Sequence, residues 1–224
     1  MFDAIVIFNS IHVDNYQEIG SSSTSGAGSP IMGEAVKRIS SAFSGGKSTE
    51  DCLSTSIQKS FVLSVDQAHA VHPNYANKHE QGHSPKMNQG MVIKRNSNQR
   101  YATNAVTGLI MKEIARRNGL PKVQEFVVRN DCGCGSTIGP IISSSTGIRA
   151  IDMGCPQLSM HSIRETMGVA DCKSFNVNIV FISYILIDSS CYIQLLTCSI
   201  VTNGLNLFKA FFKDFRDVDS SLEQ

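Results

Sequence analysis

The chain has 224 residues, 42% of them hydrophobic, which is enough to bury a substantial core in one domain. Its 20 Lys and Arg residues nearly balance its 19 Asp and Glu residues, so the formal net charge is +1 and the isoelectric point is near 7.6. This balance gives no electrostatic basis for binding nucleic acid or a membrane surface, and we expect neither partner.

The cysteine usage indicates a compartment in which thiols stay reduced. Seven cysteines occur at irregular spacing, and this odd number does not suit a disulfide framework. The start of the chain also lacks the basic segment and short apolar stretch of a secretory signal. We therefore expect a cytoplasmic protein.

The first quarter of the chain predicts a strand, a helix and a linker. Residues 1–11 form an apolar, β-branched run that suits a buried strand. A small, polar segment over 21–29 predicts a loop that enters a helix near Pro30, and the apolar face of this helix extends to Ile39. Residues 44–56 are rich in Ser, Thr and Gly and predict a flexible linker.

The segment from Ser64 to Tyr75 carries the first candidate functional residues. It follows the apolar run Phe61–Leu63, which reads as a strand, so Asp66 stands where that strand ends. Ligands of open α/β sheets bind beyond the carboxyl ends of strands, and Asp66 and His69, one helical turn apart, supply oxygen and nitrogen donors that zinc accepts. The spacing alone also allows a capping aspartate beside surface histidines.

The remaining elements alternate along the chain. His79 and His83 are expected on a loop rather than a helix, because Gly82 and Pro85 interrupt that segment. Strands are expected at 91–94, 125–129 and 147–153, and amphipathic helices at 101–118 and 202–215.

Two cysteines lie in a glycine-rich turn over 130–140. Cys132 and Cys134 form a Cys-x-Cys pair, which is a common arrangement in zinc sites. No second cysteine pair follows at a zinc-finger distance, so we do not expect structural zinc here.

An apolar segment over 175–201 is rich in Ile, Val and Leu. Asp188-Ser189-Ser190 divides it into halves, and each half is shorter than the about 20 apolar residues of a transmembrane helix, so we expect no membrane span. The segment reads either as two strands that turn near Asp188 or as a translated intron.

Four segments of the chain resemble, in family order, the aspartyl aminopeptidase family of dinuclear zinc exopeptidases. They are QEIGSSSTSGAGSP (17–30), SVDQAHAVHPNYANKHEQGHSPKMNQGMVIKRNSNQRYATNAV (64–106), RNDCGCGSTIGPIIS (129–143) and IDMGCPQLSMHSIRET (151–166). The resemblance covers roughly residues 14–170 and resumes near 202–215, which makes 175–201 an atypical insertion.

This resemblance implies a fold and an activity. The fold would be α/β, with a mixed open sheet flanked by helices as in zinc exopeptidases. The activity would be a zinc metallo-aminopeptidase that removes N-terminal Asp or Glu from peptides by attack of zinc-activated water. The family uses two zinc ions and forms homo-oligomers.

The resemblance also assigns roles to single residues. Glu18, Asp66 and His161 match metal ligands. Lys94 matches a lysine that recognises the acidic side chain of the substrate, Tyr101 matches a tyrosine near the scissile carbonyl, and His69 supports the same substrate site.

One departure from the family pattern concerns the general base. The family has two consecutive glutamates, and this chain has Gln17 at the position of the first, the base, with Tyr16 as an extra residue before it. A carboxamide cannot accept the proton of a zinc-bound water, and loss of a general base commonly costs about 10²–10⁴-fold in rate. Gln17 therefore predicts a weak or inactive catalyst, unless it reflects an error in the gene model.

A second departure is the extent of the match. The family's first histidine ligand, its bridging aspartate and its dimerisation domain fall upstream of the matching segments, so residues 1–224 resemble the carboxyl-terminal part of the catalytic domain. The alternative function is therefore a catalytically inactive truncated isoform or pseudoenzyme, which at most assembles with full-length subunits.

Overall fold

The computed structural model describes residues 21–24, 26–45, 48–171, 193–197 and 202–222. The predicted strand over 1–11 lies outside these residues. The chain divides into two compact units. One is formed by residues 1–64, 137–150 and 176–198, and the other by 65–136, 151–175 and 199–224.

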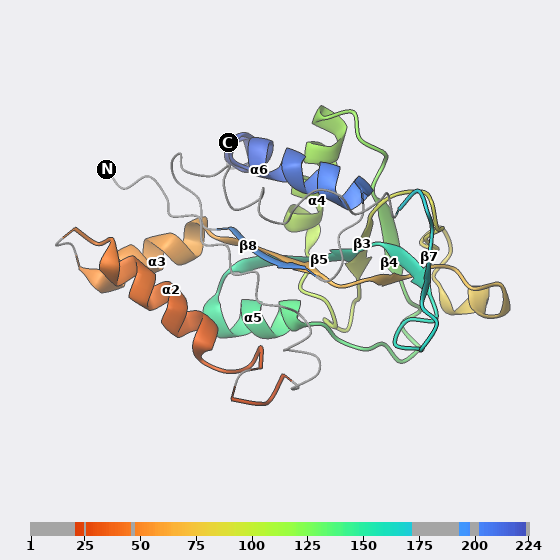
Figure 1. The fold of residues 1–224 in the computed structure, drawn as a ribbon, viewed down its shortest axis with the longest axis horizontal. Helices are drawn as coiled ribbons and strands as arrows, with labels where there is room; N and C mark the ends of the chain where they lie inside the picture. The colour runs from red at the N-terminus through yellow and green to blue at the C-terminus, as the bar shows by residue number, and fades with distance from the viewer. Residues whose placement is uncertain (1–20, 25, 46–47, 172–192, 198–201, 223–224) are drawn as a thin grey trace. The chain divides into compact units, whose positions relative to one another are not determined.

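The first unit is built mainly from three helices, α2 (Ile31–Ala42), α3 (Thr49–Lys59) and α5 (Ile138–Thr146). Helix α2 packs against both α3 and α5, and Met32 and Val36 are its buried apolar residues (Figure 1). The unit also holds most of strand β1 (Phe61–Val65), all five residues of which are buried, and strand β8 (Ile193–Thr197). Strand β8 is the only described part of the apolar segment 175–201.

Helix α3 corrects the prediction of a flexible linker over 44–56. Ser48 caps the helix, because its hydroxyl accepts the backbone N–H of Asp51. Glu50 and Asp51 lie in the first turn and Lys59 in the last, so the side-chain charges complement the helix dipole. These end effects stabilise a helix whose Ser- and Thr-rich composition reads as a linker.

The second unit contains strands of two sheets. Strand β3 (Val92–Arg95) pairs in parallel with β4 (Gln124–Val127) and antiparallel with β5 (Arg149–Gly154), so this sheet is mixed. In the other sheet, β2 (Ala68–His69) pairs in parallel with β6 (Pro156–Leu158), which pairs antiparallel with β7 (Thr166–Met167). A short 3-10 helix, η1 (Pro73–Lys78), follows β2.

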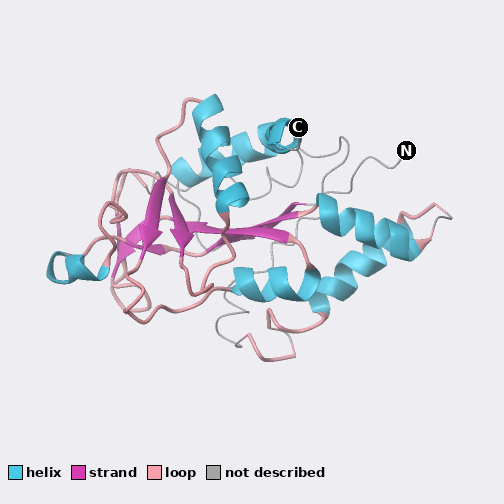
Figure 2. Cartoon of the chain, turned by 180° about the vertical axis from the view of Figure 1, so that it is seen from behind, coloured by secondary structure: helices cyan, strands magenta, loops and turns pink. Residues whose placement is uncertain are grey.

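Two helices of this unit, α4 (Ala105–Arg117) and α6 (Thr202–Leu222), pack against each other (Figures 1 and 2). Asn104 and Thr107 form a capping box at the start of α4, which explains why the helix begins after the predicted residue 101. Apolar side chains are buried on both helices, namely Ile110, Met111, Ile114, Leu207, Phe211 and Phe215. The prediction of an α/β fold with a mixed sheet flanked by helices is confirmed.

The strands predicted at 61–63, 91–94, 125–129 and 147–153 are present as β1, β3, β4 and β5, within a few residues of the expected bounds. His79 and His83 lie outside any α-helix, as predicted. One local expectation is wrong: His69 follows Asp66 in an extended strand, not one turn along a helix. Among the helices in the described part of the chain, none has the length and apolar character needed to cross a membrane.

Candidate functional site

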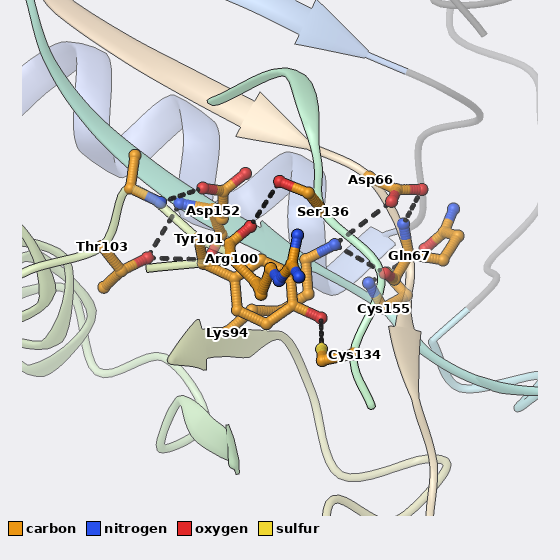
Figure 3. A network of polar contacts seen from close by, with 11 residues as sticks. Asp66, Gln67, Lys94, Arg100, Tyr101, Thr103, Cys134, Ser136, Asp152 and Cys155 are labelled. Atoms are coloured by element: carbon orange, nitrogen blue, oxygen red, sulfur yellow. Dashed lines mark hydrogen bonds and ion pairs between the residues drawn. The ribbon is translucent and has the colours of Figure 1, made fainter. Parts of the chain in front are cut away.

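The candidate site lies in the second unit, around the ammonium group of Lys94 (Figure 3). Lys94 is on β3, and its side chain is only 3% exposed. Its Nζ atom lies 3.2 Å from Oδ2 of Asp66 and donates to the carbonyl oxygen of Gln67 at 3.0 Å. A buried ammonium is stable only when paired, and Asp66 supplies the opposite charge.

Asp66 is held from two sides. It comes directly after β1, and its Oδ1 atom accepts the backbone N–H of Gln67 at 2.8 Å while Oδ2 faces Lys94. Its side chain keeps 22% of its surface exposed, so the carboxylate is open to solvent on one side. Asp66 therefore stands at the end of a buried strand, as the sequence predicts.

Tyr101 forms the other wall around Lys94. The Nζ atom of Lys94 lies 5.1 Å from the centre of the Tyr101 ring, within the range of a cation–π contact. The ring packs edge-on against Phe126, and the hydroxyl lies 3.2 Å from the sulfur of Cys134. Burial raises the pKa of Tyr101 well above its usual value, and the hydrogen bond with Cys134 raises it further. Tyr101 is therefore a neutral phenol at physiological pH.

His69 connects the lysine to the second part of the site. Partial burial is the largest cause that lowers the pKa of His69, and the charges of Lys94 and His161 lower it further. The Asp66 carboxylate acts in the opposite direction. His69 is consequently a neutral imidazole near pH 7, and it lies within electrostatic reach of Lys94, Asp66 and His161.

The pairing of β2 with β6 brings His161 toward this site. In that register Ala68 faces Pro156 and His69 faces Gln157, so the segment after Asp66 runs beside the segment before His161. The backbone of His161 has a φ of 65°, which is uncommon for a residue other than glycine, and its N–H donates to the carboxylate of Glu165. His161 is exposed.

The close contact between β5 and the end of β1 requires a glycine. A Cβ atom at Gly154 would lie 1.7 Å from the carbonyl oxygen of Asp66, which is far inside the contact distance of two atoms. Only Gly at this position lets the Asp66 backbone approach β5.

Of the predicted site residues, five lie in the described part: Asp66, His69, Lys94, Tyr101 and His161. Gln17 and Glu18 lie outside the described residues. Asp66 and His161 supply a carboxylate and an imidazole, which suit zinc. Within the described ranges, however, no group of three or more His, Cys, Asp or Glu side chains gathers at a spacing that could hold a metal ion. The described residues alone therefore supply two donors that suit zinc but do not complete a metal centre.

Sequence reasoning missed Asp152, which anchors the segment that carries Tyr101. Asp152 is fully buried in β5, and its carboxylate accepts the backbone N–H of Ala102 at 2.6 Å. Its backbone N–H donates to the hydroxyl of Thr103 at 2.9 Å, and that hydroxyl donates to the Asp152 carbonyl. A signal was present, because an acidic residue stands inside the apolar run 147–153.

Gln67 was also missed. Its side-chain oxygen accepts the backbone N–H of Cys155 at 2.9 Å, and its carbonyl accepts Lys94. Gln67 therefore links the end of β1 to the segment that enters β6. No sequence pattern indicates this role.

Comparison with protein-family models gives a match over most of the chain. Residues 7–181 match the family described as aminopeptidase I zinc metalloprotease (M18).

Known proteins of similar sequence carry the same kind of name. The chain is 50% identical over 208 residues to a probable aspartyl aminopeptidase of Ricinus communis. This alignment covers 93% of this chain and 36% of the relative. The chain is 41% identical over 217 residues to the aspartyl aminopeptidase of Dictyostelium discoideum. This alignment covers 95% of this chain and 38% of the relative. The chain thus spans about a third of the length of the curated relatives it matches.

A solved structure titled as the yeast mApe1 dodecamer superposes with a TM-score of 0.67 at 32% identity. The match covers 92% of this chain and 38% of that chain.

Proposed function

The chain belongs to the aminopeptidase I zinc metalloprotease (M18) family, and from this we propose that it contributes to a zinc aminopeptidase site that removes N-terminal Asp or Glu from peptides. The observation that carries the acidic specificity is the buried ammonium of Lys94. The proposal also draws on the two relatives named as aspartyl aminopeptidases.

Lys94 suits recognition of a substrate carboxylate. An ammonium has three hydrogens, and the described residues provide two oxygen acceptors, on Asp66 and Gln67. The remaining hydrogen can bind an acidic side chain. Because Lys94 is 3% exposed, a carboxylate that reaches it leaves water and gains a stronger electrostatic attraction than a surface lysine provides.

Tyr101 and His69 would serve the same substrate. The neutral phenol of Tyr101 can donate a hydrogen bond to a carbonyl oxygen without introducing a charge. The neutral imidazole of His69 can donate or accept, and it lies within electrostatic reach of both Lys94 and His161. Tyr101 and His69 would thus orient a bound peptide, and neither would compete with Lys94 for the carboxylate of the peptide's acidic side chain.

We assign Glu18, Asp66 and His161 as metal ligands, with two zinc ions in the assembled site. When bound, zinc supplies a Lewis acid that polarises the peptide carbonyl and lowers the pKa of water. The family and the yeast dodecamer support a homo-oligomer, and the reduced-thiol composition supports a cytoplasmic location.

The test of specificity compares two reporters. With added zinc, the purified chain should hydrolyse an aspartyl reporter faster than a leucyl reporter, and Lys94→Met should abolish this preference. Lys86→Met is the matched control, because Lys86 is exposed and lies outside the site. Equal hydrolysis of both reporters by the unaltered chain would refute the assigned specificity.

The second candidate function is an inactive chain that assembles with full-length subunits. Two observations favour it: the described residues contain no three-donor metal group, and Gln17 stands at the general-base position. Under this function, neither reporter is hydrolysed with zinc present, and the chain co-purifies with a full-length relative. Gln17→Glu then separates a missing base from missing ligands, since it raises turnover only when the metal site is complete.

A further inference from the structure

The glycine-rich loop that follows β4 carries two thiols that the proposed function does not use. Cys132 and Cys134 are separated by Gly133, and both are free cysteines. Both are half-buried and pack against one small hydrophobic cluster that includes Tyr101 and Phe126. Two thiols on one short loop, against one surface, are placed to react with each other.

The loop backbone allows these thiols to meet. Residues two apart span at most about 6.6–7.2 Å, and a disulfide requires Cα atoms about 4.4–6.8 Å apart. Gly133 can adopt the bend that shortens this span, because it has no side chain and its surroundings are open: an added Cβ would meet nothing within 4 Å. The open space around Gly133 therefore lets the loop bend as an S–S bond requires.

One of the thiols also touches the candidate site. The sulfur of Cys134 lies 3.2 Å from the hydroxyl of Tyr101, whose ring lies beside the ammonium of Lys94 (Figure 3). A disulfide bond is about 2.05 Å long and uses the thiol of Cys134, so we expect bonding to Cys132 to move this sulfur and break its contact with the hydroxyl. Because Tyr101 is only 8% exposed, its hydroxyl then lacks both this partner and ready access to water.

We propose that Cys132 and Cys134 form a reversible disulfide by exchange with a low-molecular-weight disulfide such as glutathione disulfide. One cysteine thiolate attacks a sulfur of the reagent, forms a mixed disulfide and releases one glutathione thiolate. The other cysteine thiolate attacks the mixed disulfide, forms the Cys132–Cys134 bond and releases the second. The protein loses two electrons and two protons, and the reagent gains them as two thiols.

The exchange transmits the redox state of the solution to Tyr101. An effect of this disulfide on peptide binding rests on the proposed function. The formation of the disulfide does not, and it is tested on the chain without substrate or zinc.

Mass analysis tests the pairing directly. Trypsin cleaves after Arg129 and Arg149, and the peptide between these sites holds Cys132 and Cys134 and no other cysteine. The native chain is equilibrated with glutathione buffers and its free thiols are then alkylated. As the buffer becomes more oxidising, this peptide should increasingly appear without alkyl groups and two hydrogens lighter than the unalkylated dithiol peptide. A peptide that carries two alkyl groups in every buffer, or two glutathionyl groups, would overturn the proposal.

A tyrosine variant tests the coupling to the site. Since the Tyr101 hydroxyl contacts only the reduced form of Cys134, Tyr101→Phe should favour the disulfide and shift the exchange equilibrium roughly two- to tenfold. Tyr75→Phe is the control, because Tyr75 is 54% exposed on η1 and should leave the equilibrium unchanged. No shift in Tyr101→Phe, or equal shifts in both variants, would overturn the coupling.

Discussion

The ion pair between Lys94 and Asp66 predicts an asymmetric response to mutation. Asp66→Asn keeps the shape of the side chain but removes the charge that compensates an ammonium only 3% exposed. Lys94→Met removes the ammonium and leaves a carboxylate that is 22% exposed and still accepts the N–H of Gln67. Leaving the buried ammonium of Lys94 without its partner should therefore lower the free energy of unfolding more than leaving the Asp66 carboxylate without its partner.

The magnitude follows from the geometry. At 3.2 Å the attraction is about 5 kcal/mol with an effective dielectric constant of about 20. In the Asp66→Asn variant the oxygen of the introduced amide and the Gln67 carbonyl recover part of this, so we expect the free energy of unfolding to fall by about 2–3 kcal/mol. For Lys94→Met we expect about 1 kcal/mol, because the methionine suits a buried position and Asp66 can turn to water.

Urea unfolding followed by circular dichroism, with a chelator present so that no metal occupies Asp66, measures these changes. The double variant, Asp66→Asn with Lys94→Met, provides the check. It no longer holds an uncompensated ammonium, so it should be more stable than Asp66→Asn alone. Equal losses in the two single variants, or a double variant less stable than Asp66→Asn, would show that Asp66 does not compensate the buried charge of Lys94.

Two further predictions concern packing and charge. Gly154→Ala should lower the free energy of unfolding by about 3 kcal/mol or more, because its Cβ would overlap neighbouring backbone. Gly133→Ala is the control and should be tolerated, because its Cβ meets nothing within 4 Å. Similar urea midpoints for the two variants would contradict this prediction. Hydrogen bonds from Arg116 and Arg117 lower the pKa of Glu113 to about 2, so its stabilising effect is complete above its unfolded pKa of about 4.3 and is lost as the pH falls toward 2. The stability difference between the unaltered chain and Glu113→Gln should therefore shrink over that range, and a difference that persists at pH 2 would argue against the ion pair.

Much of the fold could be predicted because its strands are short apolar runs that end at polar residues. The run Phe61–Leu63 and the acid that follows it are present as expected, and so is the strand that carries Lys94. Helix α3 was missed because its Ser- and Thr-rich sequence shows little apolar periodicity, whereas the end effects at Ser48 and Lys59 and the packing against α2 stabilise it.

The site was harder to predict than the fold. The parallel pairing of β2 with β6 brings His69 and His161 together, but a strand of two residues has no periodicity to read. The contact of Tyr101 with Cys134 joins residues 33 positions apart and depends on how two loops pack. Only the resemblance to the family predicts that Asp66, Lys94, Tyr101 and His161 belong to one site, and this stays a prediction.

We propose that His161 and Asp66 bind the same divalent cation. Zinc titration of the purified chain against a chromophoric chelator tests it most directly, with His161→Ala as the variant and His83→Ala as the control. His83 is a suitable control because it faces Glu80 and Glu125, outside the site. We expect a weak zinc site whose affinity falls at least about tenfold in His161→Ala and not in His83→Ala. Zinc affinity that is unchanged in His161→Ala, or that falls equally in both variants, would contradict it.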